Sequence, residues 1–279
     1  MHLGSPLLVI FMSLTSQMWG SCLIKKYYLN FNNLETVDYL DGILLHDMKA
    51  SLLNSDIGII KIEGLAAVSS RERKKSIFVN ITQSLGNIMI QNPNKHEIIS
   101  CIYDEQRTKK NFAHHNGDVP FHTDGSFLPN PPEIVGIWVE TEAAAGGETE
   151  LVYGLKTLAE SDILISLASQ KFPFHIHDSY HIPGESPFIV KNIITNNTIV
   201  FRKDLMMQGI DDALPMSQNR KIMKELVCLL DSAFSKSPHT IKFAMKQDCI
   251  YFFNNQMFLH NRKSYIGNRV IWRTWIQKL

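Results

Sequence analysis

The segment 119–132, VPFHTDGSFLPNPP, contains a histidine and a carboxylate two residues apart, His122 and Asp124. In an extended backbone, side chains at positions i and i+2 point to the same side, so this imidazole and this carboxylate converge on one point. A set of two histidines and one carboxylate holds Fe(II) and leaves coordination positions open for a chelating co-substrate and O2. A His-x-Asp pair is common by chance, so this segment alone is weak evidence for a metal site. It supplies two of the three ligands, and a second histidine must come from elsewhere in the chain.

The C-terminal segment 250–279 supplies that histidine. His260 is expected between two strands, and the second strand opens with Arg269 and carries Arg273 on the same face. The two arginines are four residues apart, roughly 13 Å at the usual strand rise, so their guanidinium groups can serve two different anions in one cavity. A guanidinium grips a carboxylate through two parallel hydrogen bonds, which is what a dicarboxylate co-substrate requires at its far end.

A second histidine cluster offers a competing metal site. His175 and His177 in FHIHDSYHIPGESP form a His-x-His pair that would converge in a strand, and His181 follows. We expect these residues instead in a loop near the pocket. Other histidines and tryptophans are interpreted as rim, core or pocket-wall residues: His114, His115, Trp138, Trp272 and Trp275.

Short apolar, β-branched runs must position these side chains. From about residue 98 onward such runs alternate with Gly, Pro and Asn turn signals. This pattern is typical of a β-sandwich or jelly-roll, so we expect a mainly β protein with flanking helices. The strands are expected at residues 98–103, 134–141, 149–153, 188–194, 198–201, 250–253 and 269–277.

Helical spacing appears before and within this β region. Residues 70–86 place Ile77, Ile81 and Leu85 on one face, and residues 154–169 and 217–234 also have helical patterns. No internal repeat, low-complexity tract or linker divides the chain, so one domain over residues 1–279 is expected. Its lead-in elements would be residues 1–97, and its jelly-roll core residues 98–279, with a helical insertion near 204–246.

The charge balance bears on partners and location. Lys and Arg (28) nearly cancel Asp and Glu (27), so the chain has no basic field that would capture nucleic acid. The apolar run 7–14, LLVIFMSL, is too short to cross a bilayer and is interpreted as a strand or short core helix, with a signal peptide as the alternative. We therefore expect a cytoplasmic protein without a membrane partner. The sequence leaves the oligomeric state open, and a homo-oligomer is one of the alternatives.

Four ordered segments resemble one family. FHTDGSF (121–127), AGGETELVYG (145–154), NNxxxLHNR (254–262) and RxxxR (269–273) look like the TauD/TfdA family of Fe(II)/2-oxoglutarate-dependent dioxygenases, whose core is a double-stranded β-helix, the jelly-roll. The resemblance covers most of the chain. It implies that His122, Asp124 and His260 ligate iron, that Thr149 and Arg269 bind the carboxylates of 2-oxoglutarate, and that Arg273 contacts the substrate. The chain departs from the family pattern in supporting positions, at Asn254, Gln256 and Asn261.

The resemblance implies oxidation of a small molecule, by hydroxylation or desaturation, with O2 as oxidant and with release of succinate and CO2. Chlorination is disfavoured, because halogenases of this class lack the carboxylate ligand that Asp124 provides. Two alternatives stay open. One is a secondary-metabolite tailoring oxygenase that forms, for example, a vinyl or isonitrile group. The other is a non-catalytic jelly-roll binding protein, which is expected to lose one of the site residues.

Overall fold

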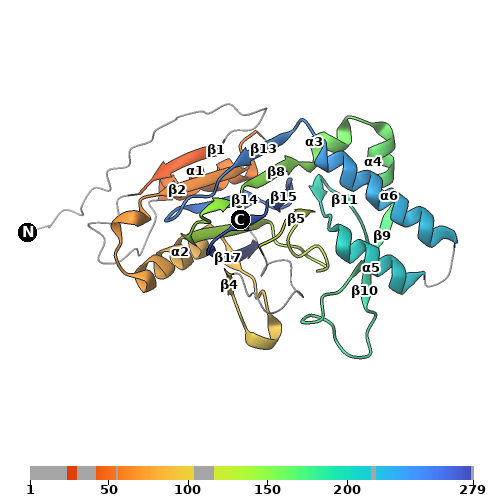
Figure 1. Cartoon of the computed structure of the whole chain (residues 1–279), viewed down its shortest axis with the longest axis horizontal. Helices are drawn as coiled ribbons and strands as arrows, with labels where there is room; N and C mark the ends of the chain where they lie inside the picture. The colour runs from red at the N-terminus through yellow and green to blue at the C-terminus, as the bar shows by residue number, and fades with distance from the viewer. Residues whose placement is uncertain (1–23, 30–41, 55, 104–115, 215–217, 278–279) are drawn as a thin grey trace, which may run out of the picture.

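The computed structural model describes residues 24–29, 42–54, 56–103, 116–214 and 218–277, and every structural statement below concerns these residues. The apolar run 7–14 and the pair His114 and His115 lie outside them. Two β-sheets pack against each other around a shared hydrophobic core (Figure 1). No helix within the described segments is long and apolar enough to span a bilayer.

The larger sheet has seven strands, in the order β1-β2-β14-β6-β17-β3, with β4 also pairing with β17. The β1–β2 pair is parallel and the other pairs are antiparallel. The strands are β1 (Ile24–Tyr28), β2 (Ile59–Glu63), β3 (Asn87–Ile88), β4 (Ile99–Tyr103), β6 (Ile134–Thr141), β14 (Ile250–Asn254) and β17 (Val270–Gln277).

The smaller sheet has four antiparallel strands in the order β13-β8-β15-β5. They are β5 (Val119–His122), β8 (Thr149–Tyr153), β13 (Thr240–Phe243) and β15 (Phe258–Arg262). Alternate residues of these strands face opposite sides, as the pleat requires. Phe258 packs into the core between the sheets, whereas Leu259 packs into the core outside the smaller sheet. His260 is therefore directed inward again.

Short two-stranded ribbons complete the β structure. They are β7 (Ala145–Gly146) with β16 (Tyr265–Ile266), β9 (Lys171–His175) with β10 (Phe188–Asn192), and β11 (Ile194–Thr195) with β12 (Thr198–Ile199). Two short 3-10 turns, Leu65–Ala67 and Pro93–Lys95, connect other elements.

Helices cover the outer face of each sheet. On the larger sheet, α1 (Gly42–Leu53) and α2 (Arg71–Leu85) share a buried cluster with Trp138 and Phe252. The predicted face of α2 is buried, and Ser70 caps the helix by accepting a hydrogen bond from the Arg73 N–H. The helices α1 and α2 thus cover one face of the larger sheet.

Four more helices lie on the opposite side of the molecule, over the smaller sheet (Figure 1). They are α3 (Gly154–Ala159), α4 (Asp162–Ala168), α5 (Lys203–Ala213) and α6 (Gln218–Ser235). Their apolar residues form one core with Phe121, Val152 and Leu259 on the outer face of that sheet. This packing fixes β5 and β15, the strands that present both candidate histidine ligands.

The predicted strands and the helices at 70–86 and 217–234 are confirmed to within a few residues, and three details differ. The helix expected at 154–169 is two helices, because Ser161 is extended and turns the chain so that α3 and α4 both pack into the same core. His260 lies within β15, where it was expected after a strand. Arg269 immediately precedes β17 and does not open it.

Candidate metal centre and its cavity

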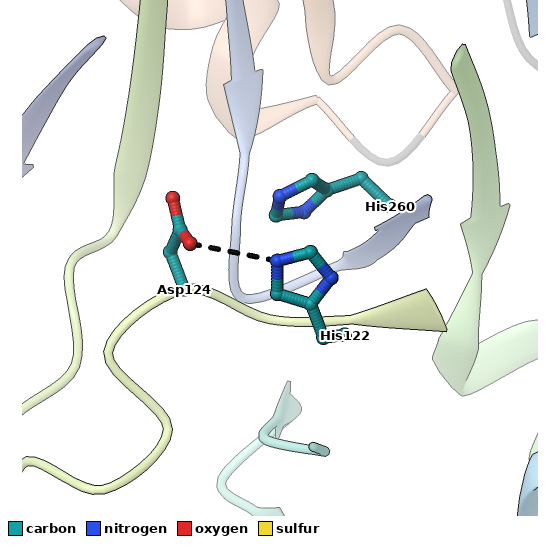
Figure 2. Close-up of side chains that lie close together, drawn as sticks. All are labelled: His122, Asp124 and His260. Carbon is teal, nitrogen blue, oxygen red and sulfur yellow. Dashed lines mark ion pairs between the residues drawn. The ribbon is translucent and has the colours of Figure 1, made fainter. Parts of the chain in front are cut away.

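The ends of β5 and β15 bring two imidazoles together. His122 is the last residue of β5 and lies directly opposite His260 in the antiparallel pair, with ring centroids 4.1 Å apart. Asp124 follows two residues later in the turn, and its Oδ1 lies 3.7 Å from His122 Nε2. Figure 2 shows the three side chains pointing toward a common centre. Each offers one ligand atom, and these atoms lie within 4.8 Å of one another.

Hydrogen bonding fixes which nitrogen of His122 faces this centre. His122 Nδ1 lies 3.0 Å from the Pro120 carbonyl oxygen. A carbonyl oxygen only accepts, so Nδ1 carries the proton and the neutral ring keeps an unprotonated Nε2. That nitrogen is the one directed at Asp124, which is the tautomer that a metal ligand requires.

His260 is held in the neutral form. Desolvation by the surrounding protein, together with the neighbouring His122, lowers its pKa well below the ordinary value of 6.5. Its buried Nδ1 has no hydrogen-bond partner among the described residues. A buried histidine with a purely structural role normally has its ring nitrogens hydrogen-bonded. The neutral His260 ring therefore fits a metal ligand better than a structural residue.

Asp124 is almost completely buried and remains ionised. Burial alone would raise the pKa of its carboxyl, but the Arg273 guanidinium and the nearby His122 outweigh that effect and hold the pKa well below its usual range. Arg273 Nη1 lies 3.0 Å from Oδ1, and Trp275 Nε1 donates to Oδ2 at 2.9 Å. The carboxylate is therefore charged and held on both oxygens by β17.

The backbone of Asp124 is held by Asn255, in the turn between β14 and β15. The Asn255 amide accepts from the Asp124 N–H at 2.9 Å and donates to the carbonyls of Asp124 (3.1 Å) and Pro132 (2.9 Å). Asn261, one of the departures from the family pattern, binds Glu150 across β15 and β8 and does not touch the triad. The substituted positions thus leave the three-residue cluster assembled.

These residues fit a ferrous ion. Two neutral imidazoles and one carboxylate are the donor set of the facial Fe(II) site, and two of the donors are held by second contacts that set their direction. In the part of the chain that the structure describes, this is the one group of His, Cys, Asp or Glu that could hold a metal. His175 instead pairs with Asp212 and Gln208, so the competing cluster does not form there.

The cluster opens into a cavity of about 540 Å³. All six residues singled out from the sequence line it, and its wall also contains residues that sequence reasoning did not assign: Gln91, Phe127, Tyr180, Arg202, Asp204 and Arg262. Trp275, expected in the core or wall, also contacts the triad directly. Phe127 and Arg262 fall within the quoted family motifs without having been assigned a role, and no local pattern in the sequence marks the other four.

Arg269 provides an anion-binding group in this cavity. Its guanidinium is buried and lies over the Tyr265 ring, and no carboxylate is paired with it in the described part of the chain. Burial, reinforced by the neighbouring charge of Arg262, lowers its pKa to about 10. Thr149 on β8 lines the same cavity. A buried cation of this kind is stabilised by an anionic ligand, because desolvation penalises it when it is alone.

The family model described as "Taurine catabolism dioxygenase TauD, TfdA family" matches residues 32–275. The chain belongs to the TauD/TfdA family. The recognition made from the four sequence motifs is thereby confirmed. Enzymes of the TauD/TfdA family use Fe(II), 2-oxoglutarate and O2, and the His-Asp-His cluster is compatible with them. No curated protein sequence matches the chain.

Solved structures confirm the TauD-like double-stranded β-helix. A taurine dioxygenase from Burkholderia xenovorans is similar with a TM-score of 0.57 at 14% identity, covering 90% of this chain and 86% of that one. A mutant of the non-heme iron oxygenase OrfP, in complex with (3S)-hydroxy-L-Arg, gives 0.64 at 11%, covering 85% and 80%. The PvcB protein from Pseudomonas aeruginosa gives 0.58 at 17%, covering 91% and 86%.

The lowered pKa of His260 predicts a pH dependence of folding. Below about pH 6.5 the unfolded chain takes up a proton at this ring that the folded protein does not bind, so acid destabilises the fold. The metal-free protein should lose about 1.4 kcal/mol of unfolding free energy per pH unit through this group. Urea denaturation in the presence of a chelator, from about pH 6.5 to about pH 5, measures this change of the unfolding free energy with pH. In His260→Gln the unfolding free energy should fall less steeply with decreasing pH, by about 1.4 kcal/mol per pH unit. An equal pH dependence in wild type and variant would contradict the prediction.

Asn255→Ala should weaken metal binding by about 10- to 100-fold, because the turn that carries Asp124 loses all three amide contacts. Calorimetric titration with Co²⁺ measures this. Asn254→Ala is the matched control, since Asn254 is equally buried but its side chain bonds Leu52, Gln256 and Met257 instead. Equal losses of Co²⁺ affinity in both variants would show that the effect is only general destabilisation.

Proposed function

We propose that this protein is an Fe(II)- and 2-oxoglutarate-dependent dioxygenase that oxidises a small molecule. The observation that carries the proposal is that one cavity is lined both by the compact His-Asp-His cluster and by Arg269, a buried arginine with no carboxylate partner among the described residues. Its volume of about 540 Å³ lies in the range of small-molecule sites. A cytoplasmic location, and no nucleic acid or membrane as partner, belong to the same proposal.

Each site residue has a role in this proposal. His122, Asp124 and His260 hold iron, Thr149 and Arg269 bind the carboxylates of 2-oxoglutarate, and Arg273 serves the primary substrate. The bound metal and keto acid supply the oxidising chemistry, in which 2-oxoglutarate and O2 become succinate and CO2 while the substrate is oxidised. The protein's own contribution is to orient both ligands and to exclude water.

Apolar residues of the larger sheet and of the turn after Asp124 perform that exclusion. Ile137 and Ile271 from the larger sheet and Phe127 from the turn after Asp124 line the cavity beside the cluster. A dry wall strengthens the interactions of the buried charges and limits side reactions. Hydroxylation and desaturation then differ only in where the target carbon lies, so the mass of the product decides between them.

The test is turnover of purified protein with Fe(II), ascorbate, 2-oxoglutarate and a broad substrate panel, read as succinate formed and iron bound per chain. We expect one iron per chain and succinate formation that His122→Ala removes. His175→Ala is the matched control and should retain both, because His175 is tied to Asp212 outside the cluster. Absence of iron binding together with absence of succinate would contradict the proposal and favour a non-catalytic jelly-roll.

A further inference from the structure

The loop 176–187, which joins β9 to β10, forms part of the cavity wall (Figure 1). It belongs to the His-rich segment singled out from the sequence, and the metal cluster uses none of its histidines. His177, Ser179 and Tyr180 of this loop line the cavity, as does Phe127. Any chemical role of the loop therefore depends on what these side chains offer to a bound molecule.

Hydrogen bonds hold His177 in a defined turn. Its carbonyl accepts from the backbone N–H groups of Tyr180 at 2.8 Å and His181 at 3.2 Å. The Tyr180 hydroxyl donates to the Ile90 carbonyl at 3.0 Å, which ties the loop to the segment between β3 and β4. The Phe127 ring packs edge-on against Tyr180, with centroids 5.0 Å apart, and lies 6.0 Å from the His177 ring. The imidazole is thus presented from a fixed turn beside an aromatic wall.

The contacts of Nδ1 determine where the His177 ring carries its hydrogen. Nδ1 lies 3.3 Å from the backbone nitrogen of Ser179 and 2.8 Å from the Ser179 Oγ. A backbone N–H only donates, so Nδ1 is an acceptor and is unprotonated. Desolvation and the positive charge of Arg202 lower the pKa of the ring below 6.5, so the ring is neutral at neutral pH. A neutral imidazole whose Nδ1 accepts carries its hydrogen on Nε2.

The two ring nitrogens point in diverging directions, so the Nε2–H of His177 is turned away from Ser179, and no residue of the described segments bonds to it. We propose that this N–H is a specificity-determining donor for the primary substrate, and that it binds a neutral oxygen acceptor such as an amide carbonyl or a hydroxyl. This inference rests on the proposed function and adds one feature of the substrate to it.

A neutral donor selects ligands differently from the cavity arginines. A guanidinium attracts an anion over several ångströms, whereas an N–H dipole acts at contact and requires an aligned acceptor. A bound molecule without the acceptor would cover this N–H and leave it unsatisfied, which costs binding free energy. The rings of Phe127 and Tyr180 beside it favour a planar or apolar group next to the acceptor. The substrate class is therefore a small molecule in which a neutral oxygen acceptor adjoins such a group.

The first measurement is the tautomer of His177 in solution. Long-range proton–nitrogen NMR of histidine-labelled protein, loaded with diamagnetic Zn²⁺ and 2-oxoglutarate at about pH 7.5, distinguishes a protonated from an unprotonated ring nitrogen. The His177→Phe variant assigns the resonances. We expect a protonated Nε2 and an unprotonated Nδ1, and a protonated Nδ1 would overturn the inference.

The second measurement titrates the same complex with benzamide, a planar neutral amide, and follows the His177 and loop resonances. Wild type should bind benzamide about fivefold more tightly than His177→Phe, which keeps a planar ring but has no donor. His177→Gln restores a neutral N–H and should recover part of the affinity. His181→Ala is the matched control, because His181 belongs to the same loop but does not line the cavity, and it should bind benzamide as wild type does.

Thiobenzamide separates the hydrogen bond from the shape of the ring, because sulfur replaces the acceptor oxygen and accepts only weakly. It should bind wild type and His177→Phe equally. Absence of benzamide binding, equal benzamide affinity in wild type and His177→Phe, or an equal loss for both probes would overturn the inference. Circular dichroism and thermal melting establish that each variant is folded. Failure of wild type to bind Zn²⁺ and 2-oxoglutarate would instead contradict the proposed function, so the two failures are distinguishable.

Discussion

Replacing Asp124 by Asn should lower 2-oxoglutarate-dependent succinate formation by at least about 1,000-fold, equivalent to about 4 kcal/mol. The amide has nearly the same shape and can still accept from Trp275 or Arg273, but it removes the only anionic ligand of the cluster. Two neutral imidazoles and an amide bind Fe(II) poorly, because the carboxylate supplies the charge that the site offers the cation. Succinate formation and iron content per chain are the measurements.

A second cavity carboxylate provides the control for this substitution. Asp204 lines the same cavity and pairs with Arg202, but it lies outside the triad. Asp204→Asn should therefore keep iron binding, and any fall in turnover should appear in substrate affinity. If Asp124→Asn retains iron and turnover at the level of Asp204→Asn, the three-residue cluster is not the metal site.

Arg269→Met should weaken 2-oxoglutarate binding by about 30-fold or more, since truncating one partner of a buried charge pair costs about 2–5 kcal/mol. The same substitution removes a buried cation that has no carboxylate partner in the described residues, so the free energy of unfolding should not fall. Calorimetric titration of Co²⁺-loaded protein with 2-oxoglutarate measures the affinity, and thermal melting measures the stability.

Two variants show whether this effect is specific. Arg269→Lys keeps the charge but loses the planar fork, so its affinity should lie between those of wild type and Arg269→Met. Arg202→Met removes another cavity arginine, one already paired with Asp204, and should change 2-oxoglutarate affinity far less. An equal loss in Arg202→Met and Arg269→Met would mean that the cavity attracts the keto acid by general charge alone.

Local pattern was sufficient for much of the fold. The strands at residues 134–141 and 149–153 were predicted to the residue, because alternation and β-branching act over five to eight neighbouring positions. The break at Ser161 was missed, since α3 and α4 have one continuous helical pattern and only their packing into a shared core requires a turn. The single-domain organisation over residues 1–279 stays a prediction.

The sequence by itself determined the chemistry that is available: two histidines, one aspartate and one arginine, placed by spacing and motif so that strands could present them together. Only the tertiary structure decided what Arg273 and Trp275 contact. Arg273 was predicted to contact the substrate and Trp275 to lie in the core or the pocket wall. Both instead donate to Asp124, across 149 and 151 residues of chain. Such contacts depend on how the larger sheet stacks on the smaller one, and packing at that distance leaves no periodic signal in either segment.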